Sequence, residues 1–71
     1  MEKNRESSKV QSVYVRMMKY LSEEMRFRFA EHIDAPVDLL EYLSYDPVPR
    51  VRYAVLANPS TPSEVRDRIM L

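Results

Sequence analysis

The stretch ANPSTPSEVRDRI, residues 57–69, places two prolines three residues apart in a run that otherwise favours helix. Pro59 follows Asn58, and a residue that precedes proline is pushed out of the α region, so a helix should end there. Pro62 is tolerated in the first turn of a helix, where its missing N–H would have no partner. The two prolines therefore predict the end of one helix and the start of the next.

The neighbouring polar residues predict how these helix ends are capped. Thr61 and Glu64 have the spacing of a capping box, in which a hydroxyl and a carboxylate each accept a hydrogen bond from a free main-chain amide. Asn58 tolerates unusual backbone angles, which is how a chain with no glycine can make this turn. Asp46 is expected to cap the preceding helix, with Pro47 as its first residue.

Apolar spacing predicts the helices of the first half. One amphipathic helix is expected over about residues 8–22, with Ser7 or Ser8 as its cap and a charged, flexible tail before it at residues 1–7. Its apolar stripe consists of Val10, Val13, Tyr14, Met17 and Leu21. Ser22 is followed by two glutamates, which favours a break in the helix at this point. The apolar spacing continues to Ile33, however, so a single long helix is the alternative. Pro36 then begins a helix with Val37, Leu40 and Leu43 on one side.

The chain contains an internal repeat. A shift of 26 residues brings MRFRFAEHIDAPVDLLEYL, residues 25–43, onto VRYAVLANPSTPSEVRDRI, residues 51–69, so that Arg26 meets Arg52 and Pro36 meets Pro62. A fixed period of this size indicates stacked helix-turn-helix units, none of which can bury its apolar side alone.

Residues 43–65 strongly resemble the variant leucine-rich repeat, a HEAT-like helical unit. The residues that match its pattern are Leu43, Asp46, Val51, Arg52, Val55, Asn58, Pro59, Thr61, Pro62 and Val65. In the first copy the segment HIDAP, residues 32–36, stands in place of the Asn-Pro-x-Thr-Pro motif. It lacks the first proline and the capping hydroxyl, and Asp34 can cap the following helix instead. Some members of the family carry an iron–sulfur cluster on cysteines, but this chain has no cysteine, so that cofactor is not expected.

The resemblance implies a right-handed stack of short paired helices that serves mostly as a binding scaffold. The predicted fold is therefore all-α, a short right-handed solenoid of two HEAT-like repeats preceded by an amphipathic helix. Its single domain covers residues 8–71, divided into an N-terminal helix at 8–24, a degenerate repeat at 25–50 and a second repeat at 51–71.

Composition excludes several classes of function. Lys plus Arg equals Asp plus Glu at 11 each, which disfavours a chain built mainly to neutralise nucleic-acid phosphates. The charge is nevertheless uneven, with a net +3 over residues 1–28 and a net −3 over residues 29–71. No apolar run approaches the roughly 18 residues of a membrane span, and the absence of cysteine favours a reducing, cytoplasmic setting.

Catalysis is not expected. His32 is the single histidine and aligns with Asn58 at a helix end, where it should cap the helix and complement its dipole with charge. No nucleophile or metal-type cluster accompanies it, and no small-molecule substrate is indicated. Arg26 and Arg52 are interpreted as structural, each binding helix-end carbonyls or a carboxylate at the junction between repeats.

The function predicted from the sequence is a non-catalytic protein-interaction module that binds another protein or a second copy of itself. The candidate contact residues are Tyr42, Tyr45 and Tyr53, which lie off the apolar stripes, and the apolar chain end Ile69, Met70 and Leu71. The alternative is a small nucleic-acid-binding regulator. It would use Arg16, Lys19, Arg26 and Arg28, interleaved with Tyr14, Tyr20 and Phe27.

Overall fold

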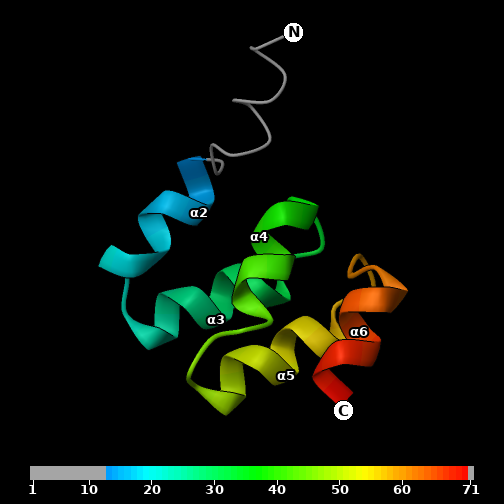
Figure 1. Ribbon diagram of the computed structural model, residues 1–71. Helices are drawn as coiled ribbons and strands as arrows, with labels where there is room; N and C mark the ends of the chain where they lie inside the picture. The colour runs from blue at the N-terminus through cyan, green and yellow to red at the C-terminus, as the bar shows by residue number, and fades with distance from the viewer. Residues whose placement is uncertain (1–12, 71) are drawn as a thin grey trace, which may run out of the picture.

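The computed structural model describes residues 13–70. Within this range the chain forms five α-helices and one 3-10 helix and no strand, which confirms the predicted all-α class. The elements are α2 (Val13–Met17), η1 (Met18–Tyr20), α3 (Glu23–Glu31), α4 (Val37–Leu43), α5 (Pro49–Ala57) and α6 (Ser63–Met70), coloured along the chain in Figure 1. The predicted tail and the Ser7 or Ser8 cap lie outside the described residues.

The core is built where the helices meet. α3 and α5 lie side by side, α4 contacts α2, α3 and α5, and α6 packs against α5 (Figure 1). None of these helices exceeds nine residues, too short to be stable alone, so their stability comes from packing. Every described helix contributes to the buried cluster of Val15, Met18, Ala30, Leu39, Leu40, Leu43, Val51, Ala54, Val55 and Val65.

The chain breaks between η1 and α3, as Ser22 predicts. Leu21 is extended, at φ −102° and ψ 152°. Ser22 then caps α3, because its hydroxyl accepts a hydrogen bond of 3.3 Å from the amide of Met25. Two glutamates follow in the first turn of α3, where a negative charge is favourable. Residues 13–33 therefore do not form one continuous helix, which was the alternative for residues 8–33.

The corners at Pro36 and Pro62 share one set of main-chain hydrogen bonds, spaced 26 residues apart. In the first corner, His32 N donates to Phe29 O, Ala35 N to His32 O, and Leu39 N and Leu40 N both donate to Pro36 O. In the second corner, Asn58 N donates to Val55 O, Thr61 N to Asn58 O, and Val65 N and Arg66 N both donate to Pro62 O. Each proline accepts the first bonds of the helix that follows it, so the helix starts predicted at both prolines are confirmed.

The predicted start of α5 is wrong by two residues. Val48, not Asp46, is the N-cap, and Pro49 is the first residue of the helix. The carboxylate of Asp46 instead accepts a 3.0 Å bond from the amide of Val48 and is held by Arg26. This contact fixes Asp46 and Pro47 in the turn, and a second proline at position 49 is equally able to open the helix.

The capping roles predicted at the second corner are also corrected. Asn58 ends α5 as predicted, but at φ −74° and ψ 121°, and no residue in the described range has a positive φ. The Thr61 hydroxyl does not cap α6; it donates a 2.7 Å bond back to the carbonyl of Val55. Thr61 is buried between the two helices, so its hydroxyl meets the end of α5 rather than the amide of Glu64.

Two apolar stripes face differently from the prediction. In α2 the buried residue is Val15, and Val13, Tyr14 and Met17 are exposed by 67%, 48% and 41%. α2 is apolar on two sides. α4 packs against the side that carries Val15, and this side leads on to the buried Met18 of η1. In α4, Leu39 is buried together with Leu40 and Leu43, whereas Val37 is half exposed, because α4 packs against helices on more than one side.

Candidate functional site

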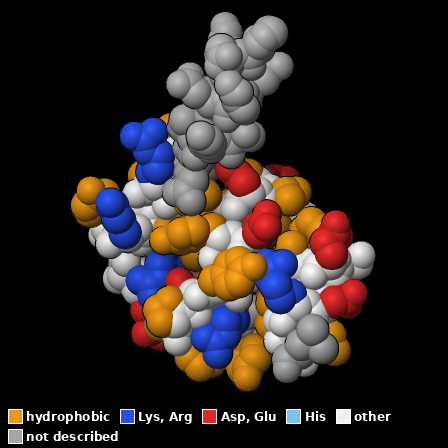
Figure 2. Space-filling view, in the orientation of Figure 1, with side chains coloured by type: hydrophobic (Ala, Val, Ile, Leu, Met, Phe, Trp, Pro, Cys, Tyr) orange, Lys and Arg blue, Asp and Glu red, His pale blue; other side chains and the backbone are white. Residues whose placement is uncertain are grey.

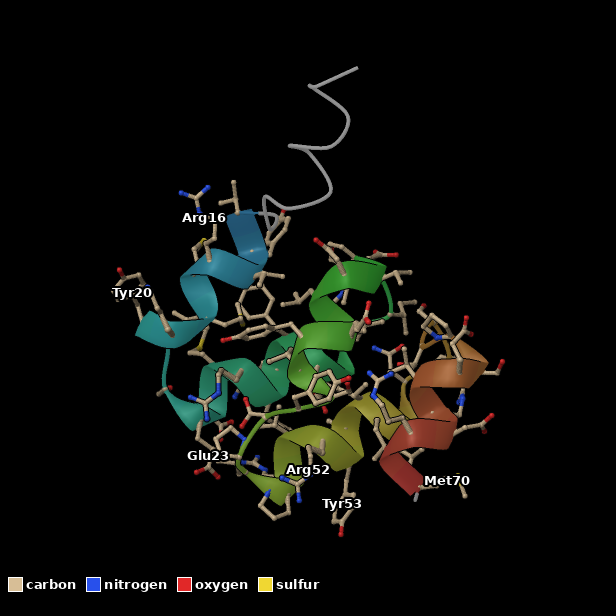
Figure 3. The ribbon with its side chains drawn as sticks, in the orientation of Figure 1. Arg16, Tyr20, Glu23, Arg52, Tyr53 and Met70 are labelled. Carbon is tan, nitrogen blue, oxygen red and sulfur yellow. The ribbon has the colours of Figure 1, made fainter. Side chains whose placement is uncertain are left out.

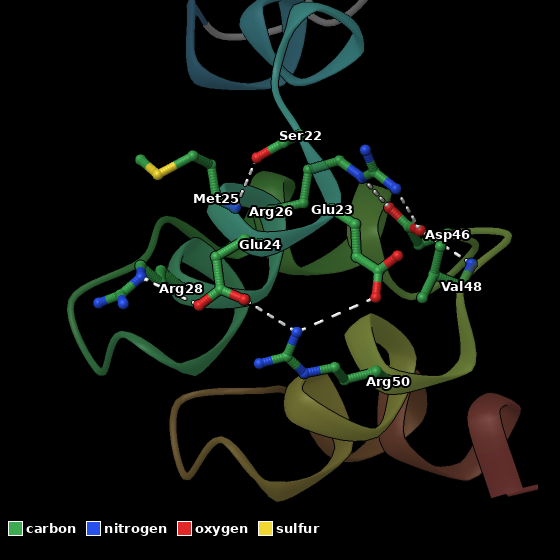
Figure 4. Close-up of polar contacts among 9 residues, drawn as sticks. All are labelled: Ser22, Glu23, Glu24, Met25, Arg26, Arg28, Asp46, Val48 and Arg50. Carbon is green, nitrogen blue, oxygen red and sulfur yellow. Dashed lines mark hydrogen bonds and ion pairs between the residues drawn. The ribbon is translucent and has the colours of Figure 1, made fainter.

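Arg26 joins the start of α3 to the turn before α5. Its guanidinium binds both carboxylate oxygens of Asp46, at 2.7 and 3.2 Å (Figure 4). It also donates a 3.0 Å bond to the carbonyl of Leu21. The hydrogen bond to Asp46 raises the pKa of Arg26 above its ordinary value. Arg52 repeats this role, because it donates a 2.6 Å bond to the main-chain carbonyl of Asp46. Both arginines therefore bind a main-chain carbonyl or a carboxylate, as the structural interpretation predicts.

A surface ion-pair group lies beside this contact. Arg50 of α5 binds Glu24 of α3 at 3.0 Å and approaches Glu23 at 3.9 Å, and Arg28 binds Glu24 at 3.3 Å (Figure 4). The hydrogen bond and charge of Arg50 lower the pKa of Glu24 below its ordinary value of 4.5. The Arg50 guanidinium also stacks over the ring of Phe27, 3.8 Å from its centre. Arg50 is thereby held against α3.

An apolar groove runs between α3 and α5 next to Arg50. It has a volume of about 640 Å³, within the range of sites that bind ligands. Its lining consists of Phe27, Glu31, Arg50, Tyr53, Ala54, Ala57, Asn58 and Pro59. Most of these groups are apolar, and the carboxylate of Glu31 has no hydrogen bond or ion pair with any described residue. The groove therefore offers an apolar floor with one free carboxylate at its edge.

Asn58 is a lining residue whose main role is structural. It is buried, and its amide nitrogen donates 2.8 Å bonds to the carbonyls of Ala30 and His32 at the end of α3. Its side-chain oxygen accepts a 2.8 Å bond from the amide of Ser60. Asn58 thus fixes the ends of α3 and α5 to each other, and this fixes one end of the groove.

The three candidate tyrosines are exposed but do not form one surface. Tyr53 is 62% exposed and lines the α3–α5 groove, on the same side as Met70 in Figure 3. Tyr45 is 65% exposed and lies under the guanidinium of Arg68, 4.5 Å from the ring centre. Tyr42 is 38% exposed and lines a different groove, between α2 and α4.

The apolar chain end is only partly open. Ile69 packs against the core and is half-buried, whereas Met70 is 69% exposed. Leu71 lies outside the described residues. Of the apolar end predicted as a contact surface, Met70 is the described side chain that is free to meet a partner.

The basic residues predicted as a nucleic-acid surface are divided by their contacts. Arg26 is bound to Asp46, and Arg28 is bound to Glu24. Arg16 and Lys19 line the α2–α4 groove of about 510 Å³, together with Val13, Val15, Met17, Tyr20 and Tyr42. Lys19 lies 5.4 Å from the ring centre of Tyr20. Two of the four predicted cations are therefore free, and both lie on the α2–η1 segment.

His32 lies at the predicted helix end. It is the C-cap of α3, and its Nδ1 accepts a 3.1 Å bond from the amide of Asp34. The ring thereby contacts the turn that follows α3. Within residues 13–70, no group of three or more His, Cys, Asp or Glu side chains could hold a metal ion. No helix in this range has the length and apolar character to cross a membrane.

Sequence reasoning missed the α3–α5 groove and the roles of Arg50, Phe27 and Asn58 in it. One signal was present, because Glu24 and Arg50 have opposite charges and stand 26 residues apart, at the repeat interval. The groove itself could not be read from the sequence, since its walls come from two helices. Comparisons with protein-family models, with curated proteins and with solved structures found no match.

Proposed function

We propose that this protein is a non-catalytic protein-interaction module, built as a short right-handed solenoid of two repeats like the variant leucine-rich and HEAT-like repeats. The recurrence of the same corner hydrogen bonds 26 residues apart supports the repeat. The pairing of α3 with α5, the helices that begin the two copies, supports the stacking. The module binds another protein or a second copy of itself.

The observation that carries this proposal is the apolar groove between α3 and α5. Phe27, Tyr53 and Pro59 provide flat apolar surfaces, and Ala54 and Ala57 leave room for a side chain between them. Rings with a polar tip, such as Tyr53, are enriched in protein interfaces because they bury apolar area with few rotatable bonds. A segment of a partner protein with an apolar anchor residue fits this lining.

The charges at the groove indicate which residue should stand next to the apolar anchor in the ligand. Arg50 is already paired with Glu23 and Glu24, whereas Glu31 has no partner among the described residues. A lysine or arginine next to the apolar anchor would pair with Glu31. The proposed ligand is therefore an apolar segment flanked by a basic residue.

A peptide-display selection against the full chain tests this proposal. Enriched peptides should share an apolar residue beside Lys or Arg, and Tyr53→Ala should weaken their binding about tenfold, the effect of losing an aromatic anchor. Tyr45→Ala is the matched control, because Tyr45 is equally exposed but lies outside the groove. Equal loss in both variants, or no enrichment, would argue against the groove as the binding site.

The second candidate function is nucleic-acid binding by the basic first half, favoured by the free cations Arg16 and Lys19 beside Tyr20 and Tyr42. Duplex DNA titrated at 50 and 200 mM salt separates the two functions. Phosphate binding must weaken steeply with salt, by roughly tenfold or more for two or more contacts, and must be lost with Arg16→Ala and Lys19→Ala together. Binding to an apolar groove should change little with salt.

A further inference from the structure

α2 and η1 present a surface that their own fold leaves uncovered. Val13, Met17 and Tyr20 are exposed by 67%, 41% and 79%, and Arg16 and Lys19 lie among them. These residues follow the spacing of one helical side. Neither Arg16 nor Lys19 has a hydrogen bond or ion pair with a described residue, whereas every other described arginine binds a carboxylate, a carbonyl or a hydroxyl. We name this surface the basic stripe.

A second surface, on α4 and the turn before it, has the complementary character. Ile33 and Val37 are exposed by 61% and 53%. Asp34, Asp38 and Glu41 are exposed beside them, and their carboxylates have no partner among the described residues. We name this surface the acidic stripe. Each stripe combines exposed apolar side chains with unpaired charge of a single sign.

The two stripes lie on neighbouring helices. α2 contacts α4, and Tyr42 lines the groove between them. On the face shown in Figure 2, Lys and Arg side chains lie over α2 and also across the lower part of the molecule, and Asp and Glu side chains lie over α4 and toward α6. A two-fold axis that runs between α2 and α4 would place α2 of each copy on α4 of the other. The basic stripe of each copy would then lie on the acidic stripe of its partner.

We propose that a second copy of this chain covers this surface, with the basic stripe of each copy on the acidic stripe of the other and Tyr42 near the axis. The separation of charge favours this occupant, since each copy supplies both an apolar, basic surface and the apolar, acidic surface that complements it. The contact is closed and self-complementary, so association should stop at two copies. It uses other residues than the α3–α5 groove, so the two proposals can fail independently.

Sedimentation equilibrium of the full chain over a wide range of concentration tests the proposal. The expected result is a reversible dimer that dissociates more readily at high salt, because salt screens the contacts between the stripes. A single-chain mass at every concentration would overturn it.

Charge reversal provides the sharper test. Arg16→Glu with Lys19→Glu makes both stripes acidic, and Asp38→Lys with Glu41→Lys makes both basic, so each double variant alone should dimerise at least about tenfold more weakly. An equimolar mixture of the two double variants should restore the dimer as a heterodimer, since each stripe then meets its opposite. Recovery in the mixture also shows that both variants fold, which the circular dichroism of each checks separately.

The matched control is Glu64→Lys with Asp67→Lys on α6, which makes the same change in net charge at exposed positions outside both stripes. This control should dimerise like the wild-type chain. An equal loss in the control, or no recovery in the mixture of folded double variants, would overturn the proposed pairing. A mass that keeps rising beyond two copies would contradict the two-fold arrangement.

Discussion

The guanidinium of Arg26 holds the carboxylate of Asp46 through two hydrogen bonds, across 20 residues of chain. Asp46 is buried and the Arg26 side chain is only 18% exposed, so the pair is shielded from solvent. It joins the start of α3 to the turn that leads into α5. The contact between α3 and the turn that leads into α5 thus includes a two-point ionic contact as well as apolar packing.

Asp46→Ala should lower the free energy of unfolding by roughly 2–3 kcal/mol, because it removes a charge-assisted pair and leaves Arg26 without its main partner. Urea denaturation of Asp46→Ala, Arg26→Met and the double variant measures this as a cycle. The double variant should be more stable than the sum of the two single losses predicts. Strict additivity would mean that the two residues do not act as a pair.

Asn58→Ala should destabilise the chain by roughly 2–3 kcal/mol, since it leaves the buried carbonyl of Ala30 and the partly buried carbonyl of His32 without the Asn58 donor. Asn58→Asp keeps the shape but replaces the donors with oxygen, and should be at least as harmful at neutral pH. The introduced carboxyl is expected to have a raised pKa, because burial disfavours its charge. The Asn58→Asp variant should therefore regain part of its stability as the pH falls. Its unfolding temperature at pH 4 and pH 7, compared with that of the wild-type chain, would show this.

Thr61→Val should lower the free energy of unfolding by about 1 kcal/mol, the contribution of its hydrogen bond to Val55 O. Thr61→Ser keeps the hydroxyl and serves as the control. Glu64→Ala should have little effect, because Glu64 lies exposed in the first turn of α6 and takes no part in a capping box with Thr61. A large decrease in the free energy of unfolding for Glu64→Ala would indicate that Glu64 does form a capping box with Thr61, and would contradict the observed role of Thr61.

The pH dependence of stability should include a contribution from Glu24. Its pKa is lowered in the folded state by Arg50, so its stabilising effect is present above the unfolded pKa and is lost as pH falls through the folded pKa. Between about pH 5 and pH 3, the wild-type chain should lose more stability than Glu24→Gln. Glu31→Gln, on the same helix but without an ion pair, is the control and should follow the wild-type slope. Urea midpoints measured across this range give the comparison, and identical slopes in all three proteins would contradict it.

The helix ends were predictable where proline sets them. Pro36, Pro59 and Pro62 limit the backbone of their immediate neighbours, and a local constraint can be read from a local sequence. The start of α5 was misplaced, because two prolines in the same turn satisfy this constraint equally. The position was decided by the contact of Asp46 with Arg26, which the sequence does not display.

The sequence offered Tyr42, Tyr45 and Tyr53 as candidate contact residues, but it placed exposed Tyr14 on the apolar stripe, and it did not predict how the tyrosines are distributed over the surface. Tyr53 belongs to the α3–α5 groove, and Tyr42 belongs to the α2–α4 groove. Which side of α2 becomes buried depends on the side that α4 covers, and the sequence of α2 is apolar on two sides. The basic and acidic stripes are consequences of that choice.

The sequence by itself determined the all-α class and the corners at Pro36 and Pro62, because the geometry of proline acts within a few residues. It favoured a break at Ser22 but left one long helix as an alternative, which the structure excludes for residues 13–33. Tertiary structure alone decided the partners of Asp46 and Asn58, the outward side of α2 and the groove beside Phe27. Each of these depends on atoms from helices that are distant in sequence, and packing selects among several locally equal arrangements.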